Sequence, residues 1–188
     1  MKKISIFASG GGSNAQKIYD YFKGGGQVEI DSVVCNSPEA KVLERSKEWG
    51  CSEIVVTKEG FKSTDELSKI LLDRGTDLIV LAGFLWLVPM SLLKAFPDRI
   101  INIHPALLPK YGGKGMHGMN VHKAVQKANE NESGITIHYI NEEYDKGDVL
   151  FQANCSVKGM DANEIAAEVL KLEHKYFPEV IKKLLINE

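Results

Sequence analysis

The chain has 188 residues, enough for one domain with a sizeable hydrophobic core. Hydrophobic residues make up 44% of the sequence and charged residues 26%, and the formal net charge is −2, so no overall basic field indicates a nucleic-acid partner. No apolar stretch is long enough to span a bilayer or to form a signal-peptide core. The three cysteines are scattered, which argues against a disulfide framework or a zinc knuckle. We therefore expect a cytoplasmic protein that binds neither nucleic acid nor membranes.

Apolar runs alternate with helical patterns in the first half of the chain. We expect strands at 4–8, 28–35, 53–57, 77–82 and 99–104, and helices at 13–22, 38–49 and 64–74. Glycines follow each of these helices, as they commonly do at helix C-termini. This βαβα alternation predicts a parallel sheet wrapped by helices.

The pattern changes after Pro105. We expect a helix at 121–129, two strands at 134–140 and 148–157 with a turn between them, and a long helix from 161 to about 185 that Pro178 kinks or divides. The predicted fold class is therefore α/β and Rossmann-like. It has a mostly parallel twisted sheet flanked by helices, a C-terminal antiparallel strand pair and a long final helix, within a single domain over 1–188.

A glycine-rich loop, Ser9-Gly10-Gly11-Gly12-Ser13-Asn14-Ala15, follows the first strand and opens a helix. One interpretation is a tight turn with Ser13 as the N-cap. The other is an anion site, because free N–H groups and the helix dipole favour phosphate there. No carboxylate ends the second strand and no GK[ST] follows, so the pattern fits one phosphate better than NAD or ATP.

Two polar residues, Asn102 and His104, interrupt the apolar strand that Pro105 ends. Side chains two apart in a strand share a face, with Cα atoms roughly 6.5 Å apart. They sit at the carboxyl end of the strand, where open α/β sheets bind their ligands. An Asn amide and a protonated His can together stabilise an oxyanion, and His can also move protons. A carboxylate would help to keep the His protonated, but spacing does not choose between Asp145 and Asp148.

Other catalytic patterns are absent from the sequence. There is no GxSxG nucleophile elbow. The remaining histidines form no compact metal constellation, so we expect no metal. These are His117, His122, His138 and His174. We interpret His138, which alternates with Thr136 on its strand, as a packed residue or one that supports the site from behind.

Five segments together carry a family resemblance over nearly the whole chain. They are Asn102–Pro105 with Leu107–Pro109, Gly134–His138 followed by Asp145, Ser9–Asn14, Leu81–Phe84, and Glu173-His174. The sequence resembles the phosphoribosylglycinamide formyltransferase family, folate-dependent enzymes of purine synthesis. The resemblance implies transfer of the formyl group of 10-formyltetrahydrofolate, as co-substrate, to the amine of glycinamide ribonucleotide. The products would be formylglycinamide ribonucleotide and tetrahydrofolate, on the route to IMP.

The resemblance also implies residue roles. Asn102 and His104 would stabilise the tetrahedral intermediate, and Asp145 would support the protonated His104 and relay protons, which selects Asp145 over Asp148 by resemblance alone. The ribonucleotide phosphate would lie on Gly12, Ser13 and Asn14, with Glu173 at the glycinamide or ribose end. The folate pocket would be lined by Asn102 and by two segments, Leu85, Trp86, Leu87 and Val88, and Asn141, Glu142, Glu143, Tyr144 and Asp145. Residues 1–100 would then be the phosphate-binding half, and 101–188 the folate and catalytic half.

Some features depart from the family. Leu85-Trp86 replaces a Met and a basic residue, so Trp86 packs on the folate or belongs to the core. Lys62 stands near a position where the family has an arginine. The loop 112–118 has the composition of a mobile lid. We expect small-molecule substrates as partners, and a monomer or weak homodimer.

Three other functions share part of this pattern. Formyltetrahydrofolate deformylase and methionyl-tRNA formyltransferase share the formyl-transfer core but usually carry an additional domain. We expect no room for either addition, because the chain starts at its first strand and ends with one helix. A non-catalytic nucleotide-binding module would explain the glycine loop but not Asn102, His104 and Asp145.

Overall fold

The computed structural model describes residues 1–63 and 65–186. Its strands form a seven-stranded sheet with the order β3-β2-β1-β4-β5-β6-β7. The strands are β1 (Lys2–Ala8), β2 (Val28–Cys35), β3 (Ser52–Val55), β4 (Leu78–Leu81), β5 (Ile100–His104), β6 (Glu132–Tyr139) and β7 (Val149–Ser156). Strands β1 to β5 are parallel, whereas β6 and β7 extend the sheet in antiparallel pairings. The predicted mixed α/β sheet with an antiparallel C-terminal strand pair is confirmed.

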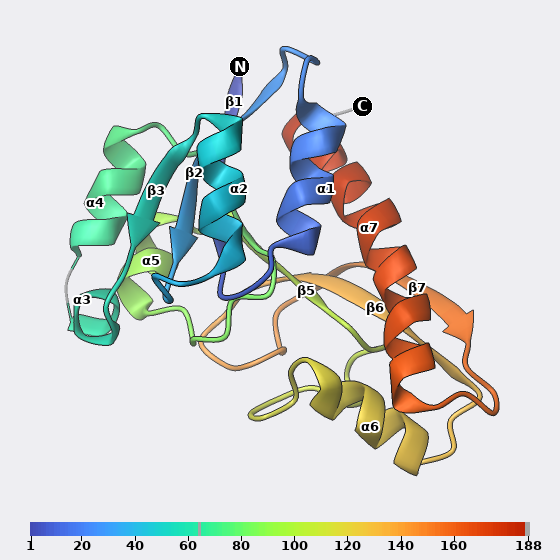
Figure 1. The fold of residues 1–188 in the computed structure, drawn as a ribbon. Coiled ribbons are helices and arrows are strands. Elements are labelled where there is room, and N and C mark those ends of the chain that lie inside the picture. The colour runs from blue at the N-terminus through green and yellow to red at the C-terminus, as the bar shows by residue number, and fades with distance from the viewer. Residues whose placement is uncertain (64, 187–188) are drawn as a thin grey trace.

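Helices cover both faces of this sheet, and each face has its own buried core (Figure 1). On one face lie α1 (Ser13–Phe22), α2 (Lys41–Trp49), α6 (Met119–Lys127) and α7 (Ala162–Ile186). On the other lie α3 (Lys58–Ser63), α4 (Glu66–Asp73) and α5 (Met90–Ala95). Neighbouring strand residues alternate between the two cores, as Ile6 and Phe7 do. None of the described helices is long and apolar enough to cross a membrane.

The helix boundaries differ from the sequence expectation at several places. The six-residue helices α3 and α5 were not expected. Helix α2 begins at Lys41 rather than at 38 because Ala40 is still extended, with φ −72° and ψ 131°. The start expected for α4, Thr64, lies outside the described residues. Helix α7 runs through Pro178 as one element, so of the two alternatives expected there, a kink or a division, the division was wrong.

Strand β1 has β2 on one side and β4 on the other, so the strand order reverses at β1. In open α/β sheets, ligands bind beside such a point at the carboxyl ends of the strands, where the loops that leave β1 and β4 begin. These two loops are tied together. The N–H of Ser9 donates to the carbonyl of Gly83 at 3.1 Å, and the N–H of Leu85 donates to the Ser9 hydroxyl at 3.0 Å. This edge is where the sequence places its candidate functional residues.

Candidate active site

The glycine loop passes from β1 into α1 through Gly12, which is the N-cap of α1. Gly12 has a left-handed backbone with φ 69°, and a Cβ added to it would lie 2.6 Å from Val42 Cγ2. The predicted alternative of Ser13 as the N-cap was therefore wrong, and no side chain caps this helix end. The first turn of α1 has no acidic residue. No described group accepts a hydrogen bond from the backbone N–H groups of residues 10–15, so they are available to an anion.

A cavity of about 660 Å³ opens beside this loop, at the carboxyl ends of β4 and β5. Most of the predicted site residues line it: Asn14, Leu85, Trp86, Leu87, Val88, Asn102, His104, Glu143, Tyr144, Asp145 and Glu173. Four others do not line it: Gly12, Ser13, Asn141 and Glu142. Gly12 and Ser13 adjoin it through Asn14. The Asn141 side chain is engaged within its own turn, where it accepts a hydrogen bond from the N–H of Glu143 at 2.9 Å.

His104 is buried at the end of β5, with 3% of its surface exposed. Its Nε2 lies 2.8 Å from the carbonyl of Tyr111, and because a carbonyl only accepts, Nε2 carries the proton. Burial lowers the pKa of His104 below its ordinary value, although the charge of Asp145 acts in the opposite direction. Burial therefore favours the neutral form of His104, which has a lone pair on Nδ1. Burial thus opposes the protonated form that the resemblance implied for His104, and the Asp145 charge favours it.

Asp145 faces two histidines. Its Oδ1 lies 3.6 Å from His104 Nδ1 and 3.7 Å from His138 Nε2, while its Oδ2 accepts a hydrogen bond from the N–H of Gly113 at 2.9 Å. Burial alone would raise the pKa of Asp145. His138 and His104 in their protonated forms, together with the Gly113 N–H, outweigh it and hold that pKa below its ordinary value. Asp145 is therefore a half-buried carboxylate placed to stabilise a positive charge that forms on His104.

Asn102 is oriented by His138, its direct neighbour across the β5–β6 pairing. His138 Nδ1 donates to the carbonyl of Tyr139 at 2.8 Å, so in the neutral ring Nε2 is an acceptor. Nε2 lies 3.1 Å from Asn102 Nδ2 and accepts one of the two amide hydrogens. The second amide hydrogen remains for a ligand in the cavity. His138 thus supports the site from behind, which was one of the two interpretations of its sequence position.

A second polar pair, Asn14 and Glu173, joins the start of α1 to α7. Asn14 Nδ2 donates to Glu173 Oε2 at 2.6 Å, which fixes the orientation of the amide. The Oδ1 atom of Asn14 is buried and has no hydrogen-bond partner among the described residues. Burial raises the pKa of Glu173, and the hydrogen bond from Asn14 only partly offsets that effect. Both groups line the cavity and can accept hydrogen bonds from ligand hydroxyl or amine groups.

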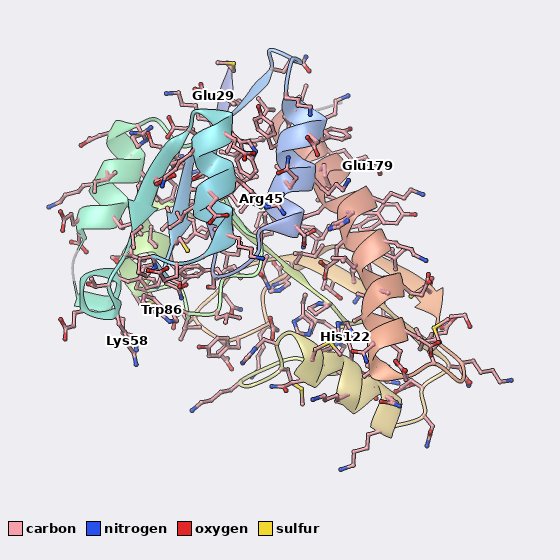
Figure 2. The ribbon with its side chains drawn as sticks, in the orientation of Figure 1. Glu29, Arg45, Lys58, Trp86, His122 and Glu179 are labelled. Carbon is pink, nitrogen blue, oxygen red and sulfur yellow. The ribbon has the colours of Figure 1, made fainter. Side chains whose placement is uncertain are left out.

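The apolar end of the cavity is built on the loop that follows β4. Trp86 contacts Phe61 and Phe84, with ring centroids 5.6 and 6.1 Å apart, and it also lines the cavity. Trp86 therefore packs against the core under α3, α4 and α5 and also borders the cavity, while its packing on the folate stays a prediction (Figure 2). Lys62, on α3, does not line the cavity.

Sequence reasoning missed two contributions to this cavity. His122, on α6, lines it and is buried, with an Nδ1 that has no partner among the described residues (Figure 2). Burial, and then the neighbouring His104, lower the pKa of His122. The spacing of His122 from Val121 and Val125 on the buried face of α6 was the available signal. The second contribution is the backbone of Tyr111 and Gly113, which contacts His104 and Asp145. Backbone groups are the same in every residue, so the sequence contains no signal for these contacts.

The described residues contain no group of three or more His, Cys, Asp and Glu side chains that could hold a metal ion. The fold and the site thus define an α/β protein of the open-sheet class. Three features meet at one cavity: a loop suited to binding an anion, an Asn–His–Asp cluster and an apolar loop. This arrangement is suited to group transfer between two small molecules.

Comparisons with known proteins agree with this arrangement. The profile of the formyl transferase family matches residues 2–181. The chloroplastic phosphoribosylglycinamide formyltransferase of Arabidopsis thaliana is 42% identical over 187 residues, which cover 96% of this chain and 64% of that protein. The phosphoribosylglycinamide formyltransferase of Bacillus subtilis is 34% identical, over 98% of this chain and 95% of that protein.

The solved structures give the same result. Glycinamide ribonucleotide transformylase 1 from Geobacillus kaustophilus matches with a TM-score of 0.89 and 34% identity, over 98% of this chain and 99% of that chain. The chain belongs to the formyl transferase family. It spans just under two thirds of the length of the Arabidopsis relative.

Proposed function

We propose that the protein transfers the formyl group of 10-formyltetrahydrofolate to the amine of glycinamide ribonucleotide, producing formylglycinamide ribonucleotide and tetrahydrofolate. The observation that carries the proposal is one cavity that Asn102, His104 and Asp145 line together with the Asn14–Glu173 pair and the loop Leu85–Val88. The relatives named above carry the same activity in their names.

The chemistry assigns a separate task to each polar residue. The substrate amine attacks the formyl carbon, and the formyl oxygen becomes an oxyanion. The free hydrogen on Asn102 Nδ2 is the donor for this oxyanion, and His138 fixes its direction. Because the amide is already oriented before the reaction, its reorientation adds little to the barrier.

His104 acts as the base in this scheme. Its Nδ1 lone pair takes the proton that the attacking amine loses, and the carboxylate of Asp145 then stabilises the imidazolium at 3.6 Å. When the tetrahedral intermediate collapses, the bond from carbon to N10 of the folate breaks, and the proton moves from His104 to N10, directly or through water. Burial favours this order of events, because it favours the neutral form of His104 before the attack.

The two ends of the cavity suit the two substrates. The unsatisfied Asn14 Oδ1 and the Glu173 carboxylate accept hydrogen bonds from the ribose or glycinamide end, while the N–H groups of residues 10–15 hold the phosphate. At the other end, the loop Leu85–Val88 and the turn Glu143–Asp145 provide apolar surface and backbone groups for the pteridine of the folate.

The proposal is tested by measuring tetrahydrofolate formation from 10-formyltetrahydrofolate with and without glycinamide ribonucleotide. We expect turnover that requires the ribonucleotide, and a loss of roughly 10²-fold or more in kcat for Asn102→Ala. Equal turnover without the ribonucleotide would identify hydrolysis of the formyl folate instead. Binding of both ligands without turnover would reject an enzyme and support a non-catalytic module.

A further inference from the structure

Helix α2 packs against the glycine loop and carries Arg45 on the side of the helix that faces α1 (Figure 2). Arg45 Nε donates to the carbonyl of Gly11 at 3.0 Å, and one terminal nitrogen donates to Gln16 Oε1 at 2.8 Å. Both partners are neutral. No carboxylate of the described residues lies within ion-pair distance of this half-buried guanidinium, so its charge is not compensated.

Arg74 differs from Arg45 in that its guanidinium has a carboxylate partner. Arg74 Nε donates to Asp31 Oδ2 at 2.5 Å, and a terminal nitrogen donates to Asp31 Oδ1 at 3.1 Å and to the Ser52 hydroxyl at 2.6 Å. Its charge is thus neutralised within the fold. Arg45 also joins two elements, but it retains its net charge and unused N–H donors beside an anion-type loop.

Helices α1 and α2 together bind three successive carbonyls of this loop. The Gly10 carbonyl accepts from the N–H of Val42 at 3.1 Å, the Gly11 carbonyl from Arg45 at 3.0 Å, and the Gly12 carbonyl from the N–H of Gln16 at 2.8 Å. Carbonyls that are turned toward the helices leave the N–H groups of the loop without protein acceptors. Such a row of free N–H groups makes an anion-binding concavity.

We propose that Arg45 is part of the phosphate site of the ribonucleotide. It supplies the positive charge that the loop itself lacks, and it keeps the Gly11 carbonyl turned away from the anion. This inference rests on the proposed function, because it takes the phosphate of glycinamide ribonucleotide as the anion. Neither the glycine motif nor the His104 cluster indicates it, since Arg45 lies on a different helix, 34 residues from its loop partner.

The test compares Arg45→Gln with Arg45→Lys, which keeps the charge, and with Lys47→Gln as a control. Lys47 is an exposed cation on the same helix. In Arg45→Gln we expect KM for glycinamide ribonucleotide to rise roughly 10- to 100-fold, with kcat and KM for the folate changed less than about twofold. Arg45→Lys should lose less, and Lys47→Gln should match the wild type.

A second acceptor separates a phosphate contact from a general effect on the loop. With glycinamide riboside, which lacks the phosphate, the wild type and Arg45→Gln should have the same kcat/KM. The dependence of KM for the ribonucleotide on salt concentration should also be weaker in Arg45→Gln, because one cation is removed from the site. An equal loss with both acceptors, at unchanged salt dependence, would overturn the inference and leave Arg45 a structural role.

Binding of ribose 5-phosphate, measured by calorimetry, keeps the inference distinct from the proposed function because it requires no turnover. Weaker binding by Arg45→Gln, with thermal unfolding unchanged, supports the phosphate site even if the assay shows another acceptor. Wild-type affinity in Arg45→Gln rejects the inference even if the wild-type enzyme transfers formyl groups to the ribonucleotide.

Discussion

Nε2 of His104 donates a hydrogen bond to the carbonyl of Tyr111 at 2.8 Å, and Tyr111 presents that carbonyl from a left-handed backbone with φ 56°. Four described non-glycine residues have positive φ, and two of them, Tyr111 and Asp145, are at this site. Such conformations cost free energy and persist where the surrounding structure holds them, which is typical of functional sites. The contact fixes the tautomer that leaves a lone pair on Nδ1, the atom that faces Asp145.

A side-chain hydrogen bond holds Tyr111 in place, because its hydroxyl donates to Glu130 Oε1 at 2.8 Å. Tyr111→Phe removes this hydrogen bond and keeps the carbonyl. We expect a loss of about 0.5–1.5 kcal/mol in the free energy of unfolding. We expect kcat to fall only severalfold, because the carbonyl contact with His104 is weakened rather than lost. Urea unfolding and steady-state kinetics measure the two effects. A fall in kcat as large as that of Asn102→Ala would show that the side chain has a direct role.

The pH dependence of kcat in Asp145→Asn tests the roles of His104 and Asp145. The charge of Asp145 raises the pKa of His104 against the effect of burial. Its removal should therefore lower that pKa further and move the acid limb of the kcat profile to lower pH, while kcat falls by roughly 10²-fold or more because the imidazolium loses its partner. Ionisation of the substrate amine affects both enzymes equally. Dividing the kcat–pH profile of the variant by that of the wild type therefore removes its effect. A ratio that is constant from pH 5 to 8 would contradict this assignment.

The pH dependence of stability follows from the buried histidines. The pKa of His122 lies below its ordinary value in the folded protein, because burial disfavours its charge. Below that ordinary value, about 6.5, the unfolded chain binds more protons than the folded protein, so stability falls as the pH drops toward the folded pKa. Above pH 7 both states are neutral, and this contribution to the pH dependence disappears.

His122→Leu removes this proton uptake and an unpaired buried nitrogen. We expect the decrease in Tm between pH 7.5 and 5.5 to be smaller in His122→Leu than in the wild type. It should not vanish, because burial also lowers the pKa of His104 and of His174. His117→Leu is the control, since His117 is exposed. Equal decreases in Tm for wild type and His122→Leu would show that His122 is protonated without cost in the folded state.

Local signals account for most of the fold. The expected bounds of α1 and β2 agree with the structure because glycines flank α1 on both sides and the apolar run of β2 is continuous. The two-residue period of a strand also placed Asn102 and His104 on the face opposite Ile101 and Ile103. These two isoleucines pack in the core under α1, α2, α6 and α7. The short helices α3 and α5 were missed because six residues cover fewer than two turns, so an amphipathic period is not visible.

The details of the site depend on long-range contacts that no local pattern contains. The pairing of Asn102 with His138 follows from the β5–β6 register, across 36 residues. From the sequence, a nearby carboxylate was expected to help to keep His104 protonated, but burial, which the sequence does not quantify, has the larger effect on its pKa. The contact between Arg45 and the glycine loop likewise requires the packing of α2 against α1.

Gly12 provides a test of the anion loop that is independent of any charged residue. A methyl group at Gly12 would lie 2.6 Å from Val42 Cγ2, and φ is 69° there. Since L side chains rarely adopt this conformation, Gly12→Ala should lose about 1–3 kcal/mol of stability and shift the loop away from α2. A shifted loop no longer aligns its N–H groups, so KM for the ribonucleotide should rise more than KM for the folate.

Gly10→Ala is the matched control, because a Cβ at Gly10 meets no atom within 4 Å and its φ is not positive. It should unfold at the wild-type urea concentration and keep the wild-type KM for the ribonucleotide. If Gly12→Ala also behaves as the wild type in both measurements, then neither the close approach to Val42 nor the left-handed turn shapes the anion site. If both variants lose ribonucleotide affinity equally, any side chain in the loop blocks the phosphate, and the backbone geometry of Gly12 is not the specific cause.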